Sequence, residues 1–499
     1  MRTSADASGR IGRAAAFNRL RPRGAYGRGH HPSDRPSSPR RQAAGLSVVP
    51  GADVYCGCVD NRRVEGVWNI GEGDRRRGWG ETIDLHAPER TGTLAPLPMR
   101  ILVLAPQPFY QPRGTPIAVR MLVKTLAEAG HEVDLLTYHE GESVPLGGAQ
   151  VHRIASLPFV ENITPGFSLK KVICDVVMAI RAAQMARRNE YDVVHAVEEA
   201  SFIARGLRGL TRTPYVFDMD SSMPQQIANE YPAARPFRPL MKVAEAWAIR
   251  SSAATVVVCK ALEDRVREAA PDTPVLRLED VSMLDDTEVE EDLRRDCSVE
   301  GAMIMYVGNL KSYQGIDLLI DAFRLVCERD DEAHLVIIGG SDEHIDQYQA
   351  QAADRGVAER VHFPGPRPLQ HLGAYLRQAD ILVSPRIEGT NTPMKIYSYL
   401  DSGRPVVATR KRTHTQVLDD EIAMLAEPTP ESMAEAMHRL IRDEDLRDRL
   451  AANARKRVAE EYSPEAFRRK LTRFYETLEQ DILASGGRGE DEAFAKTVQ

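Results

Sequence analysis

The feature that most constrains the fold is an alternation of short apolar strands with longer helical segments, which begins at Met99. Residues 100–105 (RILVLA) carry no charge after Arg100, as expected of a parallel strand that is covered on both faces. A helical pattern at 117–129 and a second strand at 131–138 follow. Strand, loop, helix and strand in this order form a βαβ unit, whose loop lies at the carboxyl edge of the sheet, where ligands bind. Gly114 in that loop allows a ligand to approach the backbone closely.

The alternation continues and divides into two series. The first series adds predicted strands at 151–154, 192–197, 215–218 and 254–259, with helices at 169–188 and 240–250. A charged run at 285–297 interrupts the pattern as an interdomain region. The second series places strands at 302–307, 334–339, 360–363, 380–383, 405–408 and 423–426, and helices at 315–327, 345–354, 369–377 and 431–441. The pattern therefore predicts an α/β protein with two Rossmann-like parallel-sheet domains that face a cleft.

The domain boundaries follow changes of composition. We predict the first domain over 99–290, the second over 298–463, an amphipathic C-terminal helix over 464–483 and a disordered tail over 484–499. Residues 1–98 contain sixteen arginines and no lysine and have little apolar periodicity, so we predict a disordered N-terminal extension. Such a tail can bind nucleic acid or an acidic surface. The simpler interpretation is a floppy extension, or upstream sequence translated from a misplaced start before Met99.

Charge and apolar patterning exclude several classes of protein. The net charge of −7 gives no reason to expect a nucleic-acid partner. The longest apolar run, 172–180, is interrupted by Asp175 and is far shorter than the roughly 20 residues of a membrane span. The six cysteines are scattered, without a metal-like spacing or a disulfide framework, which favours a reducing cytoplasm and no metal site.

The segment 384–409 has the pattern of a phosphate site. An apolar strand ends before it, and the small-residue turn Gly389-Thr390-Asn391-Thr392 leads to Pro393, where we predict a helix start with Lys395 in its first turn. Proline is tolerated there because its missing N–H would be unpaired. Free backbone N–H groups at a helix N-terminus suit a phosphate, and Lys395 adds a cation. The alternative is a surface lysine, but its charge is unfavourable against the helix dipole at that end.

Several segments taken in order carry a resemblance to a known family. They are the opening strand with its Gly114 loop and 129–133 (AGHEV), then 306–310 (YVGNL), 314–319 (QGIDLL), 336–340 (VIIGG), 361–365 (VHFPG) and 403–408 (GRPVVA). Over residues 99 to about 478, this series resembles retaining, nucleotide-sugar-dependent glycosyltransferases of the GT-B fold, in family four (glycosyl transferases group 1). The resemblance implies transfer of a sugar from a nucleotide-sugar donor to a glycan, lipid-linked or small-molecule acceptor, in cell-surface polysaccharide or glycoconjugate synthesis. It implies no cofactor and no metal.

The chain departs from the family pattern at the donor diphosphate. Asn309 and Gln314 stand where the family has an arginine and a lysine, so Lys311 and Lys395 are expected to supply the charge. Glu388 matches the first of the family's two glutamates, and Ser398 stands at the second, where it is a weaker partner for ribose hydroxyls.

The resemblance assigns site residues in both domains. Asp220, Lys395 and Glu388 are the catalytic candidates. Cations and backbone N–H groups stabilise the leaving phosphate without a metal, and the leaving phosphate itself takes the acceptor's proton. The donor-binding candidates are Gly114, Thr115, Gly308, Asn309, Lys311, Gln314, Gly365, Gly389, Thr390, Asn391, Thr392 and Ser398.

Some assignments leave alternatives open. Asp220 either meets the reacting sugar or caps the helix that begins near Met223. Glu388 either binds a donor hydroxyl or is a solvated loop residue. His195, at a strand end, is assigned a structural role.

Two wider questions concern partners and the class of function. The basic, apolar helix at 169–188 fits either peripheral contact with an anionic membrane or a helix packed in the core. The rival functions are a nucleotide-sugar epimerase on the same fold and a scaffolding protein that has lost catalysis, the latter motivated by Asn309, Gln314 and Ser398.

Overall fold

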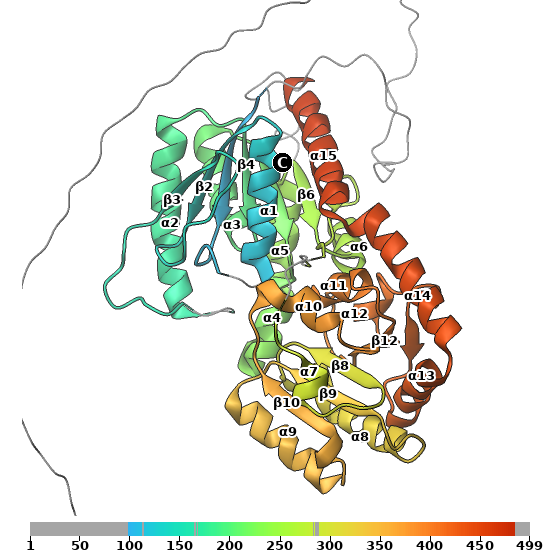
Figure 1. Cartoon of the computed structure of the whole chain (residues 1–499). Coiled ribbons are helices and arrows are strands. Elements are labelled where there is room, and N and C mark those ends of the chain that lie inside the picture. Colours follow the sequence, from blue (N-terminus) through green and yellow to red (C-terminus); the bar gives the residue numbers. More distant parts are fainter. Residues whose placement is uncertain are drawn as a thin grey trace, which may run out of the picture. The chain divides into compact units, whose positions relative to one another are not determined.

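The computed structural model (Figure 1) describes residues 98–111, 114–163, 166, 168–282, 284 and 289–484, except the side chains of 229, 230 and 232. The predicted disordered extension, apart from its last residue, lies outside the described residues. So does the predicted C-terminal tail, apart from Ala484.

The first lobe is a seven-stranded sheet in the order β3-β2-β1-β4-β5-β6-β7, and all its paired strands are parallel. Its strands are β1 Arg100–Ala105, β2 Glu132–Thr137, β3 Gln150–Arg153, β4 Val193–Val197, β5 Tyr215–Met219, β6 Ala254–Val257 and β7 Val275–Arg277. Its helices are α1 Gly114–Glu128, α2 Leu169–Arg188, α3 Ala200–Thr211, α4 Met223–Glu230, the 3₁₀ turn Pro232–Phe237, α5 Arg238–Ser251 and α6 Lys260–Ala269.

β1 is covered on both faces, which explains the uninterrupted apolar run at residues 101–105. Leu102 and Leu104 pack on one face of the sheet against α2, α3, α5 and α6. Ile101 and Val103 pack on the other face against α1 and the helix at residues 464–484. Because successive side chains of a strand point to opposite faces, a strand covered on both faces cannot alternate with polar residues.

The second lobe is a six-stranded parallel sheet in the order β10-β9-β8-β11-β12-β13. Its strands are β8 Met303–Val307, β9 His334–Ile338, β10 Val361–Gly365, β11 Ile381–Ser384, β12 Val406–Thr409 and β13 Met424–Ala426. Its helices are α7 Leu293–Asp296, α8 Ile316–Cys327, α9 Asp342–Asp354, α10 Leu372–Leu376, α11 Lys395–Asp401, α12 Arg412–Thr415, α13 Pro430–Arg442 and α14 Glu444–Arg457. The predicted fold of two parallel-sheet α/β lobes is confirmed.

The last helix, α15 (Pro464–Ala484), follows the second lobe in sequence but packs on the first. Figure 1 shows it beside α1. Phe467, Leu471, Phe474 and Tyr475 are buried there together with Leu122 of α1 and the strands. The amphipathic pattern of this helix is therefore explained by core packing against the first sheet.

Some predicted elements differ from the structure. α1 begins at Gly114 rather than at 117, so Gly114 and Thr115 lie in its first turn. The predicted helix at 369–377 is a 3₁₀ turn, Leu369–His371, followed by the short α10. Leu293, in the run taken as interdomain, is buried in a core of the second lobe. Among the described residues, no helix has the length and apolar character needed to cross a bilayer.

Candidate active site

The Lys395 side chain lies at the carboxyl edge of the second sheet. Its ammonium nitrogen is 3.8 Å from the centroid of the Tyr306 ring. A Cβ placed on Gly308 would lie 2.9 Å from that nitrogen, and Gly308 has a φ of +151°. The nitrogen is buried and has no hydrogen-bond partner among the described residues. Burial, followed by the charge of Arg386, lowers the pKa of Lys395 well below its ordinary value. The Lys395 ammonium nitrogen is thus buried and has no counter-ion among the residues that the structure describes.

Arg386 is a second cation at this place, which the sequence reasoning missed. It follows β11 by two residues, and its guanidinium lies 5.2 Å from the centroid of the Tyr313 ring. Its Nε donates a hydrogen bond to the carbonyl oxygen of Glu388, at 2.7 Å. Burial lowers the pKa of Arg386 as well. A charged residue two positions after a buried parallel strand was the signal that could have identified it.

Three predicted residues of this region hold buried polar atoms that lack a partner among the described residues. They are Gln314 (Oε1), Thr392 (Oγ1) and Lys395 (Nζ). Gln314 does use its amide nitrogen, which donates to Asn309 Oδ1 at 3.4 Å. Since buried polar atoms are nearly always paired, the three unpaired atoms, which lie on the segment 392–395 and on the turn that holds Gln314, mark this region as a candidate ligand site.

A cavity of about 420 Å³ opens beside this cluster in the second lobe. That volume lies within the range of small-molecule sites. Gly308, Asn309 and Lys311, three of the donor-binding candidates, line it, and Lys311 is exposed. Gly365 ends β10 with a φ of +81° next to the lining residue Pro366. The remaining wall comes from Val307, Leu310, Ile338, Gly339, Gly340, Ser341, His344, Arg367, Pro368, Leu369, Leu372 and Tyr375.

The small-residue turn reaches the first lobe instead of forming a helix N-terminus. α11 begins at Lys395 and has seven residues, so Pro393 lies two residues before it; the predicted helix start at Pro393 was wrong. The Asn391 side chain donates to the backbone carbonyl of Asp220. The Thr390 carbonyl accepts from Gln416 Nε2 at 2.7 Å.

Three further candidates of the segment 384–409, namely Glu388, Gly389 and Ser398, take no part in these hydrogen bonds of Thr390 and Asn391. Gly389 has a φ of +118°, and Glu388 is exposed. Ser398 is buried within α11.

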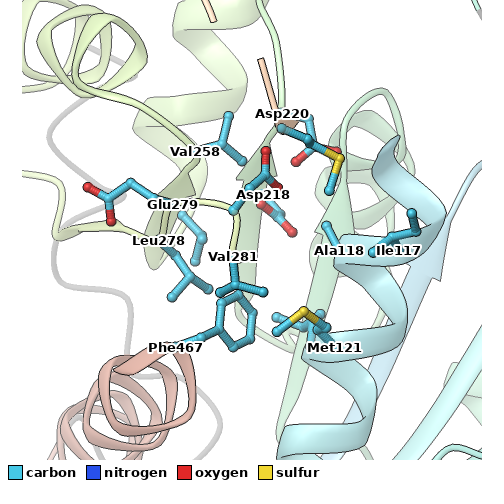
Figure 2. Close-up of a pocket in the computed structure, with 14 residues that line it drawn as sticks. Ile117, Ala118, Met121, Asp218, Asp220, Val258, Leu278, Glu279, Val281 and Phe467 are labelled. Carbon is cyan, nitrogen blue, oxygen red and sulfur yellow. The ribbon is translucent and has the colours of Figure 1, made fainter. Parts of the chain in front are cut away.

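Asp220 lies just after β5, among other carboxylates of the first lobe. Burial, Asp218 and Asp280 raise its pKa well above the ordinary value, and a hydrogen bond with Thr115 opposes the rise. A small cavity of about 20 Å³ is lined by Asp218, Asp220, Glu279 and Asp280, together with apolar side chains. Figure 2 shows Asp218 and Asp220 close together and Glu279 pointing away from both. The N-cap of α4 is Ser222, so the alternative that Asp220 caps this helix was wrong.

The first lobe also holds a cavity of about 430 Å³ at the carboxyl edge of its sheet. Gly114 and Thr115 line it, and so do Glu198, Asp175 and Gln107, which were not among the predicted site residues. Glu198 has a φ of +50°, which is uncommon for a residue other than glycine. His195 lies on β4, the strand that precedes Glu198. It is fully buried and contacts Tyr475 and Asp218, in keeping with its predicted structural role.

Known proteins match both lobes. Residues 112–275 match the family described as Glycosyltransferase Family 4, and residues 292–457 match Glycosyl transferases group 1. An uncharacterized glycosyltransferase of Methanocaldococcus jannaschii is 25% identical over 383 residues, which are 71% of this chain and 92% of that protein. The phosphatidyl-myo-inositol mannosyltransferase of Mycobacterium leprae is 30% identical over 182 residues, which are 36% of this chain and 47% of that protein.

Solved structures share the fold. Sucrose-phosphate synthase of Thermosynechococcus elongatus superposes with a TM-score of 0.63 at 18% identity, over 78% of this chain and 100% of that chain. Anabaena HepE, in complex with UDP, superposes with a TM-score of 0.62 at 15% identity, over 76% of this chain and 100% of that chain. Because the two family matches fall in order on the two lobes and the fold is shared, the chain belongs to the GT-B glycosyltransferases of family four.

Proposed function

We propose that this glycosyltransferase takes its sugar from a nucleoside diphosphate donor bound in the second lobe. The observation that carries the proposal is the buried, unpaired ammonium of Lys395 beside Gly308, with Arg386 close enough to lower its pKa. A buried ammonium that has no counter-ion among the described residues, next to the partly exposed cation of Arg386, is costly in the empty protein. A diphosphate supplies the missing negative charge, and the adjoining cavity of about 420 Å³ takes the nucleoside. Complex formation with UDP by Anabaena HepE supports this class of donor.

The proposed chemistry is metal-independent transfer with retention of the anomeric configuration. When the bond from sugar to phosphate breaks, negative charge grows on the leaving diphosphate, and Lys395 and Arg386 stabilise it in a site with little water. The leaving phosphate takes the proton from the attacking acceptor hydroxyl on the same face of the sugar. The sugar becomes oxocarbenium-like and positive. Burial, Asp218 and Asp280 raise the pKa of Asp220, and a positive charge beside the carboxyl lowers that pKa again.

The experiment is calorimetric titration with UDP, GDP and ADP and with their sugars, in the presence of a chelator. Removal of a charge-assisted contact by Lys395→Met is expected to weaken diphosphate binding by about 1.5 to 3 kcal/mol. Lys456→Met, at an exposed position of α14, serves as the matched control. Proton NMR of the product then reads the anomeric configuration. Unchanged diphosphate affinity in Lys395→Met, or loss of activity in chelator, would contradict the respective part of the proposal.

The two rival functions are separated by the same measurements. Asn309 and Gln314 bond to each other in place of two cations, which is the observation that favours a scaffolding protein. A scaffold that has lost catalysis binds no donor, or binds it without turnover. An epimerase changes the donor with no acceptor present.

The acceptor and the cellular location are proposed from α2. Its inner face packs Cys174 and Met178 into the core. Its outer face exposes an apolar stripe, with exposed fractions of 74% for Leu169, 57% for Val176 and 56% for Ile180. Lys170 and Arg188 are exposed beside the stripe. We propose that this face lies on an anionic bilayer at the inner side of the cell membrane, where a glycan or lipid-linked acceptor of surface polysaccharide synthesis is presented.

Flotation with vesicles tests the membrane contact. The protein is expected to float with phosphatidylglycerol vesicles at low salt. With phosphatidylcholine vesicles it is expected to remain in the bottom fraction of the gradient. Val176→Glu should abolish flotation, because it places a carboxylate in the stripe. Flotation that is equal for the wild type and Val176→Glu, or absent at low salt, would remove the membrane contact and leave donor binding unaffected.

A further inference from the structure

The cavity of about 430 Å³ in the first lobe is lined by both polar and apolar residues. The polar lining residues, together called the polar wall, are Gln107, Thr115, Lys171, Asp175, Glu198, Glu199 and Gln226. The apolar lining residues are Pro106, Pro108, Pro116, Val172, Val197, Met223 and Ile227. A lining that combines apolar surface with hydrogen-bonding groups matches a saccharide or cyclitol ring, which has C–H faces and a rim of hydroxyls.

An unpaired donor shows that the polar wall is incomplete without a ligand. Nε2 of Gln107 is buried and has no hydrogen-bond partner among the described residues. The backbone carbonyl of the same residue is satisfied, since it accepts bonds from Thr137 Oγ1 and from the Tyr138 N–H at 3.2 Å. The amide of Gln107 is therefore anchored by its backbone and has a free N–H group for a ligand oxygen.

The charges of this wall do not balance. Lys171 is the sole cation among the described lining residues, and its ammonium pairs with Glu199. Asp175 accepts from the Tyr138 hydroxyl at 2.5 Å, and Glu198 accepts from Ser221 Oγ at 3.0 Å. These two carboxylates have hydrogen-bond donors but no cation of their own. The described wall carries three carboxylates against one ammonium.

The surroundings of Asp175 and Glu198 raise the pKa values of both carboxyl groups. Burial, followed by the charge of Glu199, raises the pKa of Asp175 to about 7. Burial, Asp220 and Glu199 raise the pKa of Glu198 well above its ordinary value. A ligand hydroxyl that donates to these oxygens stabilises their ionised form. A ligand phosphate or carboxylate raises their pKa further, so that binding of an anion is coupled to uptake of protons.

The backbone holds Glu198 in place at some cost. With a φ of +50°, it adopts the left-handed conformation immediately after β4, and its N–H donates to the Asp218 carbonyl at 2.8 Å. A non-glycine residue in this region is strained, and such strain gathers at functional sites. The strained residue and the unpaired amide of Gln107 line the same cavity.

We propose that this cavity binds the acceptor through a polyhydroxylated ring without phosphate or carboxylate groups, and that Asp175, Glu198 and Gln107 select against anionic acceptors. The proposal rests on the proposed glycosyl transfer and names the acceptor class for it. Ring hydroxyls donate to the two carboxylates, and Gln107 donates to a ring or hydroxyl oxygen. An amino sugar is compatible with the same wall, because its ammonium is drawn to the unbalanced carboxylates.

The test pairs neutral rings with their phosphate esters, and donor binding is measured separately. The acceptors are myo-inositol with inositol 1-phosphate, methyl glucoside with its 6-phosphate, and glucosamine, each assayed with the donor whose nucleotide binds by calorimetry. The expected result is turnover of a neutral or amino ring with kcat/KM at least about tenfold above that of its phosphate ester. A protein that binds the nucleotide and prefers the phosphate esters, or uses none of these rings, would overturn the proposal. A protein that binds no nucleotide would instead overturn the proposed function.

Substitutions locate the effect. Glu198→Gln and Asp175→Asn are expected to raise KM for the neutral ring about tenfold. Both should also lower the ratio of kcat/KM for the neutral ring to kcat/KM for its phosphate ester, and leave nucleotide affinity unchanged. Glu268→Gln, a carboxylate-to-amide change at an exposed position of α6, should leave all three quantities unchanged. An unaltered preference in both cavity variants would show that selection takes place elsewhere.

Discussion

The Nδ1 atom of His195 lies 2.7 Å from the hydroxyl oxygen of Tyr475, although 280 residues separate them in the sequence. The other ring nitrogen, Nε2, lies 3.1 Å from the Asp218 carboxylate. His195 and Tyr475 are fully buried. The pair ties α15, the last helix, to the central strands of the first lobe.

The first prediction concerns the stability that this contact provides. Tyr475→Phe keeps the ring but leaves Nδ1 of His195 without its partner in the interior. We expect a loss of about 1 to 3 kcal/mol in the free energy of unfolding, which is the cost of an unpaired buried polar group. Urea denaturation followed by far-ultraviolet circular dichroism measures it. A change below about 0.5 kcal/mol, the range of neutral surface substitutions, would mean that the hydroxyl contact contributes little.

The second prediction concerns protons taken up with the diphosphate. The pKa of Lys395 in the empty protein is well below its ordinary value, and a bound diphosphate raises it again. Between the two pKa values, binding takes up a proton, so diphosphate affinity falls as pH rises through this window. Calorimetry in buffers with different ionisation enthalpies measures the uptake. We expect Lys395→Met to lose it, and equal uptake in the wild type and the variant would assign the proton to another group.

The third prediction concerns Gly315, which precedes α8 with a φ of +73°. A Cβ at this position would lie 2.2 Å from the Pro385 carbonyl oxygen, next to Arg386. Gly356 has a φ of +71° and free space for a Cβ, so Gly356→Ala measures the backbone strain alone. We expect Gly315→Ala to cost about 1 to 3 kcal/mol more in stability than Gly356→Ala, and to weaken diphosphate binding. Equal losses in both variants would show that the Pro385 loop moves without cost.

The fourth prediction concerns the pH dependence of folding. Burial, Asp218 and Glu279 raise the pKa of Asp280 from 3.8 to about 7. Between these values the folded protein holds a proton that the unfolded chain releases, so stability decreases as pH rises from about 4 to about 7. Asp280→Asn should remove up to about 1.4 kcal/mol of this decrease per pH unit. Denaturation curves at pH 5, 6 and 7 measure the slope, and an unchanged slope would contradict the raised pKa.

The strands were predictable because each must be apolar on both faces. Residues 100–105 and 303–307 lie between two layers of helices, so burial alone selects their composition. The position of Lys395 was predictable for a related reason. A lysine two residues after a proline, in a segment that follows a buried strand and a small-residue turn, is expected at the carboxyl edge of the sheet.

Other parts had no local signal. α3 buries Ala200, Ala204 and Leu207, and such small residues give a weak helical pattern. α15 has a clear amphipathic pattern, but periodicity does not say which lobe its apolar face meets. Asp175 became a candidate only when the fold placed it beside Glu199, because a single charged residue carries no periodic pattern. For Arg386 the sequence signal is its place after a buried strand, and the fold adds that it lies beside Lys395.

The return of α15 to the first lobe has a consequence for engineering and for exchange between relatives. The first lobe is assembled from two stretches of chain that lie at opposite ends of the second, so it cannot be cut out or transplanted as one contiguous cassette. A chimera that replaces everything after residue 297 would pair a foreign last helix with native Met99, Leu122 and His195. An exchange of the second lobe leaves the first lobe intact only when residues 464–484 stay with the parent of the first lobe.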